Sequence, residues 1–549
     1  MTTSLNAALA RLDQDASLGA DAGHVGRIAR LRNGSASAED WSAAATHLLR
    51  IDPAMALAVL EHALNTHARE ATLHYLKGNA LRMLGQAQAA ESSLRTAIAM
   101  QPAHADASFS LAFLLREQGR MNALVEVMLD LWNHAPRTLQ SDQRILFFLC
   151  ECGRYADAAR LLPALLAAYP DHVEIARRAG EVAMVLGQFE DAGKHLRRAL
   201  ALNPHQPSAW LRLAHTHRFS ADDDPDLGLL RSARARTDLD ADAQSAIRFA
   251  LGKALDDLQR FGEASEVLAE ANRNWRAARP WNPAAFLASV EKPLRPRAVA
   301  QGKGEEGVIP LFIVGLPRAG TTLLETLLSC DSAVRSRGEL NWIDALAARL
   351  DDKADAATVQ AAGSLYLRQL IQDDAPARVY IDKNPLNFRY LGLIAAMLPQ
   401  ARVIHLKRNL CATALSLWSQ HFAHEAMAWS YSFDDIARFA RGYRKLMTHW
   451  LAAPPLPIFE LDYETLVSDP DTAIASVRGF LQLPAGSAPA NATSTAPIAT
   501  ASVWQARQQV HTRSIERWRR YAEFLPALTE MQTMSSPSPA GGRGLGGGW

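Results

Sequence analysis

Four glycines recur at a fixed interval of 34 residues in the first half of this 549-residue chain, at Gly85, Gly119, Gly153 and Gly187. Four prolines keep the same interval, at Pro102, Pro136, Pro170 and Pro204. A period of this length indicates stacked units, none of which can bury its apolar face alone. The first half therefore cannot form one conventional core, and the length of the chain also predicts several domains.

Two further positions repeat at the same interval, one occupied mostly by small residues and the other by large apolar residues. The small position holds Gly78, Ala112, Gly180 and Ala214, and the large apolar position holds Leu94, Met128, Leu162 and Leu196. The pattern predicts two helices per unit that approach closely at the small residues. The repeated glycine suits the left-handed backbone of the turn, and the proline ends the second helix. This pattern resembles the tetratricopeptide repeat, which implies an all-α solenoid that docks a protein or peptide.

The repeats set the expected domain boundaries. Their phase breaks after Ala214, where an acidic stretch ending in Asp224-Pro225 intervenes, and it resumes at Gly252. We expect an N-terminal helical or disordered lead over 1–36, the repeat array over 37–280 and a proline- and glycine-rich linker over 281–307.

The second half of the chain has a different periodicity. Short apolar runs of strand length alternate with helical stretches, at Leu311–Val314, Val379–Ile381, Arg402–Leu406 and Ile458–Leu461. This alternation predicts a parallel sheet covered on both faces, over residues 308–533. A Gly/Pro/Ser-rich tail over 534–549 is expected to be disordered.

The first of these runs leads into a glycine-containing loop, Gly315-Leu-Pro-Arg-Ala-Gly320, and then into a helix that begins near Thr321. A buried strand, a glycine loop and a helix N-terminus together form an anion site, because backbone amides and the helix dipole favour negative charge. The G-x-x-x-x-G spacing also fits a nucleoside-triphosphate loop, but Thr321 stands where that loop needs lysine. A kinase-like enzyme is therefore disfavoured.

The Pro317-Arg-Ala-Gly-Thr-Thr322 segment resembles the 5′-phosphosulfate loop of sulfotransferases. The chain as a whole is similar to bacterial sulfotransferases that carry tetratricopeptide repeats, with a catalytic domain similar to that of the tyrosylprotein sulfotransferases. The resemblance implies an α/β P-loop-type domain with a central parallel sheet, and the donor 3′-phosphoadenylyl sulfate (PAPS) without a metal. It assigns donor binding to the loop residues Arg318, Ala319, Gly320, Thr321, Thr322 and Leu323.

Further segments carry the rest of the site that the resemblance implies. Glu339, which lies 21 residues after Arg318, inherits the role of general base, and Lys383 that of the lysine that stabilises the leaving group. Arg408 and Ser416, eight residues apart, match the residues that hold the 3′-phosphate.

Three more residues follow from the last two segments. Tyr463 lies in a run similar to the family's Y-E-x-L-V-x-x-P and lines the nucleotide site in this interpretation, although a packing role fits it equally well. Ser502 corresponds to a serine near the sulfuryl group, and Arg517 to a basic residue that contacts the nucleotide. The sequence also departs from the family: Ala319 replaces the serine of the loop, and R-G-E replaces G-E-E before the base.

The predicted function is transfer of a sulfuryl group from PAPS to an acceptor hydroxyl, with protein tyrosine favoured and the repeats docking that protein. Two alternatives stay open: a glycan, lipid or small-molecule acceptor for the same donor, and a repeat scaffold that binds nucleotide without turnover. Intact Glu339, Lys383, Arg408 and Ser416 favour the enzyme.

The net charge and the distribution of apolar residues limit the partners and the cellular location that we expect. A net charge of +1 argues against nucleic acid as a partner. No window reaches the roughly 20 apolar residues of a membrane-spanning helix. The first 20 residues include Asp13 and Asp15 and lack the apolar core of a signal peptide, so a cytoplasmic protein is expected. Nothing in the sequence indicates an oligomeric state.

Overall fold

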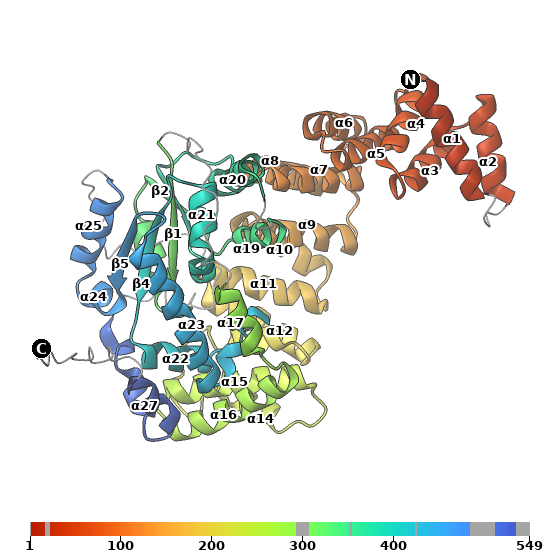
Figure 1. The fold of residues 1–549 in the computed structure, drawn as a ribbon. Coiled ribbons are helices and arrows are strands. Elements are labelled where there is room, and N and C mark those ends of the chain that lie inside the picture. Colours follow the sequence, from red (N-terminus) through yellow and green to blue (C-terminus); the bar gives the residue numbers. More distant parts are fainter. Residues whose placement is uncertain are drawn as a thin grey trace, which may run out of the picture. The chain divides into compact units, whose positions relative to one another are not determined.

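Helices alone occupy the described chain up to residue 291, and strands first occur beyond it (Figure 1). The computed structural model describes residues 2–16, 22–291, 307–350, 354–422, 425–483 and 511–533. The chain divides into two compact units, Met1–Ala158 with Ile371–Asp374, and Ala159–Leu370 with Ala375–Trp549.

The first unit consists mainly of helix pairs. Its helices are α1 (Thr2–Ala16), α2 (Ala22–Asn33), α3 (Ala38–Leu49), α4 (Pro53–Thr66), α5 (Ala71–Met83), α6 (Ala87–Met100), α7 (Ala105–Glu117), α8 (Met121–His134) and α9 (Leu139–Glu151). Helix α10 (Tyr155–Ala168) spans the division between the units.

The second unit begins with the remaining helices of the array. These are α11 (Val173–Val185), α12 (Phe189–Leu202), α13 (Pro207–Leu213), α14 (Pro225–Arg234), α15 (Ala241–Asp257) and α16 (Phe261–Ala278). The break in the repeat pattern is visible here, since α13 has only seven residues. The acidic stretch then starts a helix of its own, because the Asp224 side chain accepts hydrogen bonds from the first amides of α14.

The structure confirms the predicted close approach at the small residues of the repeats. A Cβ placed on Gly180 would lie 2.6 Å from Cγ of Leu196, and one placed on Gly252 would lie 2.5 Å from Cγ of Leu268. Both distances are too short for a carbon contact, so each large residue packs directly on the glycine backbone of the paired helix. The turn glycines are left-handed as expected, with φ between 71° and 78° at Gly85, Gly119, Gly153 and Gly187.

Part of the range expected to be a linker is helical. Helix α17 (Pro283–Glu291) packs on α23 (Phe433–Ala452), where Phe286 stacks on Phe439 with ring centroids 4.5 Å apart. A Cβ on Gly442 would lie 2.6 Å from the Phe286 ring, which is why this contact needs glycine.

Five parallel strands form the predicted sheet, in the order β2-β3-β1-β4-β5. They are β1 (Ile309–Gly315), β2 (Val334–Ser336), β3 (Val379–Asp382), β4 (Arg402–Lys407) and β5 (Ile458–Asp462). The central strand β1 pairs with β3 through Leu311 and Ile381, and with β4 through Leu311 and Arg402. The sequence analysis did not predict β2, which has three residues and, among the described strands, pairs with β3 alone.

Helices cover both faces of the sheet, as predicted. On one face Leu311 and Ile313 join a core with α18 (Thr321–Leu328), α24 (Tyr463–Ser468) and α25 (Pro470–Phe480). On the other face Phe312 stacks on Tyr366 of α20 (Ala356–Ile371), and His405 bonds to Tyr443 of α23. Figure 1 shows α24 and α25 on one side of the strands, and α20, α21 and α23 on the other.

Shorter elements complete the second unit. They are α19 (Trp342–Arg349), η2 (Pro385–Tyr390), α21 (Leu391–Met397), α22 (Leu410–Trp418), η3 (Glu425–Tyr431), η4 (Thr512–Ser514), η5 (Arg517–Tyr521) and α27 (Pro526–Thr533). In the described part of the chain, no helix combines the length and the apolar character needed to cross a bilayer.

Candidate functional site

The candidate site lies where the parallel strands end. The loops that follow the carboxyl ends of all five strands carry residues singled out by the sequence, and in open parallel sheets this edge is where ligands bind. One pocket of about 990 Å³ collects them. The predicted residues that line it are Arg318, Gly320, Thr321, Thr322, Leu323, Glu339, Arg408, Ser416, Tyr463 and Arg517.

Two of the predicted residues that the structure describes do not line this pocket. Ala319 and Lys383 are buried beneath it, with exposed fractions of 1% and 0%. Ser502 lies outside the described residues.

The glycine loop joins β1 to α18 and holds an unusual backbone. Gly320 precedes the helix with a φ of 103°, a conformation that glycine adopts at little cost. A Cβ at this position would also lie 2.3 Å from Cδ2 of Tyr463, so the tyrosine ring rests directly on the loop. Arg318 takes a positive φ of 70°, which is uncommon for a residue with a side chain and typical of functional loops. The first turn of α18 lines the pocket through Thr321, Thr322 and Leu323, and the N-terminus of a helix favours an anion there.

Two of the predicted arginines in the pocket link separate segments of the chain. Arg318 donates from Nε to the Ser416 hydroxyl at 3.0 Å, which joins the loop to α22. Arg408, just after β4, donates to the backbone carbonyls of Arg318 at 2.8 Å and Ser514 at 2.9 Å. Its guanidinium lies 4.3 Å from the centre of the Tyr463 ring. Its buried Nε has no hydrogen-bond partner among the described residues, so this N–H remains available to a ligand.

The arginines of the pocket affect one another's protonation. Burial, together with the charges of Arg408 and Arg517, lowers the pKa of Arg318 to about 10. Burial also lowers the pKa of Arg408. Burial alone would lower the pKa of Arg517 as well, but the adjacent Asp256 carboxylate raises it above its usual value. All three stay charged at neutral pH and repel one another, which favours an anionic ligand.

A buried ion-pair network lies next to this cation cluster. The Lys383 ammonium is 2.5 Å from Oε1 of Glu339 and 3.6 Å from Oε2 of Glu325. Burial acts to lower the pKa of Lys383, but the two carboxylates outweigh it and the pKa is raised. The lysine is therefore protonated at neutral pH. Glu339 faces the pocket with 49% of its side chain exposed, so it connects the buried lysine to the site.

The end of β3 is held by Asp382. Its carboxylate accepts hydrogen bonds from the Tyr366 hydroxyl at 2.7 Å, Asn387 Nδ2 at 3.0 Å, and the backbone amides of Asn384 at 2.9 Å and Leu340 at 3.3 Å. Burial raises the pKa of Asp382 to about 7, against the effect of these donors. The network fixes the backbone on both sides of Lys383 and directly after Glu339.

The sequence analysis missed several residues of the pocket. Ser514 bonds to the Tyr463 hydroxyl at 2.7 Å, and its place just before Arg517 is a signal that a closer reading of that segment could have used. The repeat array also lines the pocket, through His215 and Arg218 after α13 and through Lys253, Asp256, Asp257 and Phe261 of α15 and α16. No signal in the sequence distinguishes these from ordinary surface residues of a repeat.

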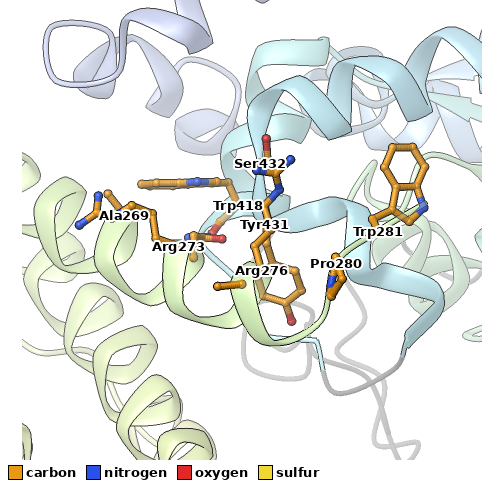
Figure 2. Close-up of a pocket in the computed structure, with 10 residues that line it drawn as sticks. Ala269, Arg273, Arg276, Pro280, Trp281, Trp418, Tyr431 and Ser432 are labelled. Atoms are coloured by element: carbon orange, nitrogen blue, oxygen red, sulfur yellow. The ribbon is translucent and has the colours of Figure 1, made fainter. Parts of the chain in front are cut away.

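A second pocket of about 560 Å³ lies beside α16 and contains none of the predicted residues. Figure 2 shows Arg273 and Arg276 of α16 beside Trp418 and Tyr431. Asn272 joins the two sides, because its Nδ2 donates to the Trp418 carbonyl at 2.9 Å. Arg276 is committed to an ion pair with Asp435, with its Nε 2.9 Å from the carboxylate.

Comparison with known proteins finds matches in both the helical part and the strand-containing part of the chain. Residues 310–487 match the model of the sulfotransferase family, and residues 75–123 and 152–215 match that of the tetratricopeptide repeat. An uncharacterized protein of Aquifex aeolicus (strain VF5) is 29% identical over 414 residues, which cover 70% of this chain and 53% of that protein. Protein-tyrosine sulfotransferase 1 of Danio rerio is 26% identical over 191 residues, covering 32% of this chain and 53% of that protein.

The chain thus spans about half the length of the curated relatives it matches. Among solved structures, the sulfotransferase domain from the Synechococcus PCC 7002 olefin synthase is similar, with 18% identity and a TM-score of 0.33. That similarity covers 45% of this chain and 100% of that domain.

Proposed function

We propose that the protein transfers a sulfuryl group from PAPS to an acceptor hydroxyl, because residues 310–487 match the sulfotransferase family model in a chain that also matches tetratricopeptide repeats. The observation that carries the proposal is the convergence of three features in one pocket. These are the glycine loop ahead of α18, the Arg408 and Ser416 pair, and Glu339 with its buried lysine partner.

The charges of the pocket support this donor. Its described lining holds eight arginine and lysine side chains against four carboxylates, although the whole chain has a net charge of only +1. PAPS carries a 3′-phosphate as well as the phosphosulfate, so it needs two separate groups of cations. The glycine loop with Arg318 suits the phosphosulfate, and Arg408, whose Nε–H has no hydrogen-bond partner in the described chain, suits the 3′-phosphate with Ser416.

The reaction we propose is a single displacement at sulfur. The acceptor oxygen forms a bond to sulfur while the bond from sulfur to the bridging oxygen of the phosphosulfate breaks. Glu339 takes the acceptor proton, and adenosine 3′,5′-bisphosphate leaves with the bonding electron pair. Arg318 and the loop amides stabilise the charge that develops on the leaving oxygen.

Lys383 has a more specific role in this proposal than its position in the sequence indicates. In the described state its ammonium contacts Glu339 and is shielded from the pocket, so it is the direct ionic partner of the proposed base. To stabilise the leaving group as well, the ammonium has to turn from Glu339 toward the pocket when the donor binds.

For the acceptor we propose a protein tyrosine. Two observations support this choice: the similarity of the catalytic region to protein-tyrosine sulfotransferase 1 of Danio rerio, and the presence of repeats of a type that generally binds proteins or peptides. In this view the array raises the local concentration of a large acceptor at the pocket.

A transfer assay tests the proposal. The full chain is incubated with PAPS that carries radiolabelled sulfate and with a cell lysate fractionated into proteins, glycans, lipids and small molecules. We expect label on protein tyrosine, which tyrosine-to-phenylalanine versions of a labelled peptide should lose. Label in another fraction would reject the tyrosine acceptor and retain the reaction. No transfer to any fraction, together with no binding of adenosine 3′,5′-bisphosphate, would reject the enzyme.

A further inference from the structure

The last helix pair of the repeat array forms part of the catalytic pocket. Helix α15 contributes Lys253, Asp256 and Asp257 to the pocket lining, and α16 contributes Phe261. The contact continues into the C-terminal segment, where the Phe261 and Tyr521 rings lie 5.2 Å apart. The array therefore supplies side chains to the site itself.

Asp256 makes the most consequential of these contacts. One of its carboxylate oxygens accepts from Nε of Arg517 at 3.1 Å and lies 2.9 Å from Nη2. The same oxygen accepts from the Tyr521 hydroxyl at 2.6 Å. Tyr521 is fully buried, and both partners belong to η5, which follows the sheet in the chain. A single carboxylate on α15 thus holds two side chains of η5.

Arg517 needs such a partner because of its neighbours. It lies close enough to Arg318 and Arg408 for its charge to lower the pKa of each of them. Three guanidinium groups that converge on one pocket repel one another and favour conformations in which one turns outward. Asp256 offsets this repulsion for Arg517, whose pKa is raised while those of the other two are lowered.

We propose that Asp256, on repeat helix α15, is a positioning residue for the donor nucleotide and acts by holding the Arg517 guanidinium in the pocket. The inference rests on the proposed function, in which Arg517 contacts the nucleotide of PAPS. It adds that the sulfotransferase-family domain by itself lacks a complete donor site, because the last repeat must supply Asp256.

The direction in which nucleotide affinity changes when Asp256 is replaced distinguishes a positioning role from a long-range effect of its charge. Asp256 is a negative charge beside a site for a polyanion, so Asp256→Asn or Asp256→Ala should tighten nucleotide binding if the carboxylate acts only at long range. If it positions Arg517, each variant should weaken binding, because the ligand must then immobilise a free arginine. Ordering one such side chain corresponds to a change in Kd of about two- to tenfold.

The experiment is calorimetric titration of the full-length chain with adenosine 3′,5′-bisphosphate. We expect Asp256→Ala and the milder Asp256→Asn to raise the Kd, and to raise the donor KM while the acceptor KM is unchanged. In an Arg517→Ala background, Asp256→Ala should cause no further loss, because its effect passes through the arginine. Asp256→Asn also serves as the measurement if the alanine variant does not fold.

Two control variants separate positioning from loss of structure. Tyr521→Phe removes one hydrogen bond to Asp256 and keeps the Arg517 pair, so nucleotide affinity should be retained. Arg276→Gln breaks an ion pair of the same kind between α16 and α23, at the second pocket of Figure 2, and should also retain it.

Three results would overturn the inference. They are a folded Asp256 variant that binds as tightly as the wild type or more tightly, an equal loss in the Arg517→Ala background, and an equal loss in Arg276→Gln. A wild-type chain that does not bind adenosine 3′,5′-bisphosphate would reject the proposed function first, and this inference with it.

Discussion

Replacing Glu339 by glutamine tests the proposed base most directly. The substitution keeps the shape of the side chain and removes its ability to accept a proton, so turnover should fall by about 10²- to 10⁴-fold. This corresponds to a barrier higher by about 3–5 kcal/mol, since each tenfold change is about 1.4 kcal/mol. Affinity for adenosine 3′,5′-bisphosphate should stay within a few-fold of the wild type.

The structure also limits how far this change can affect stability. Removing one partner of a buried ion pair costs about 3–5 kcal/mol when the remaining charge has no other partner. Lys383 keeps Glu325 at 3.6 Å, and Glu339 is half exposed, where solvent screens the pair. We therefore expect a loss of only about 1–2 kcal/mol, so Glu339→Gln should fold.

Glu325→Gln provides the matched control. It removes the other carboxylate beside Lys383, but Glu325 does not line the pocket and also accepts a hydrogen bond from Ser336. Single-turnover rates and thermal unfolding are measured for both variants. If Glu339 is the base, only Glu339→Gln loses turnover by two orders of magnitude or more. Equal losses in the two variants would mean that Glu339 serves Lys383 only as a counter-ion, and the reasoning would be wrong.

Three further changes test other parts of the site. Arg408→Ala should abolish the preference for adenosine 3′,5′-bisphosphate over ADP, a loss of about 1.5–3 kcal/mol that calorimetry with both nucleotides would reveal. Gly320→Ala should lower the free energy of unfolding, measured by denaturant titration, by about 1–3 kcal/mol, because of the positive φ and the contact with Tyr463. Gly338→Ala is the control and should cost less, because Gly338 has a φ of 66° but open space where a Cβ would lie. The raised pKa of Asp382 means that the folded state favours the protonated carboxyl group. Its contribution to the free energy of unfolding is therefore fully present below pH 3.8 and is lost as the pH rises to about 7. Urea titrations across this pH range should show the dependence in the wild type and its absence in Asp382→Asn.

Much of the fold could be predicted because its signals are local. The repeat period fixed the position of the turn glycines, and four apolar runs marked four of the five strands. The remaining strand β2 has three residues and one neighbour, so its apolar pattern is too short to detect. The short α13 and the capped α14 were visible only as a break in phase, because a broken period does not say what replaces it.

The candidate site was also predictable only where local motifs carry its residues. Arg318, Glu339 and Arg408 were identified by motifs, and the structure brings them into one pocket, although their roles stay predictions. The complete burial of Lys383 was not predictable, because its partners Glu325 and Glu339 belong to other segments that only the fold brings beside it. Asp256 had no local signal, since an acidic residue near the end of a repeat helix usually faces solvent.

The ion pair between Asp256 and Arg517 has a consequence for how such proteins can recombine. Domain exchange usually proceeds through linkers, and here the proline-rich stretch before β1 is the obvious junction. A cut at Gly307, however, would separate a guanidinium from a carboxylate that lies 261 positions away in the chain. The smallest segment that keeps this ion pair together with the sheet therefore begins before α15. A chimera that joins this sulfotransferase-family domain to a new repeat array should be fused upstream of that helix, so that Asp256 and Arg517 stay in one piece.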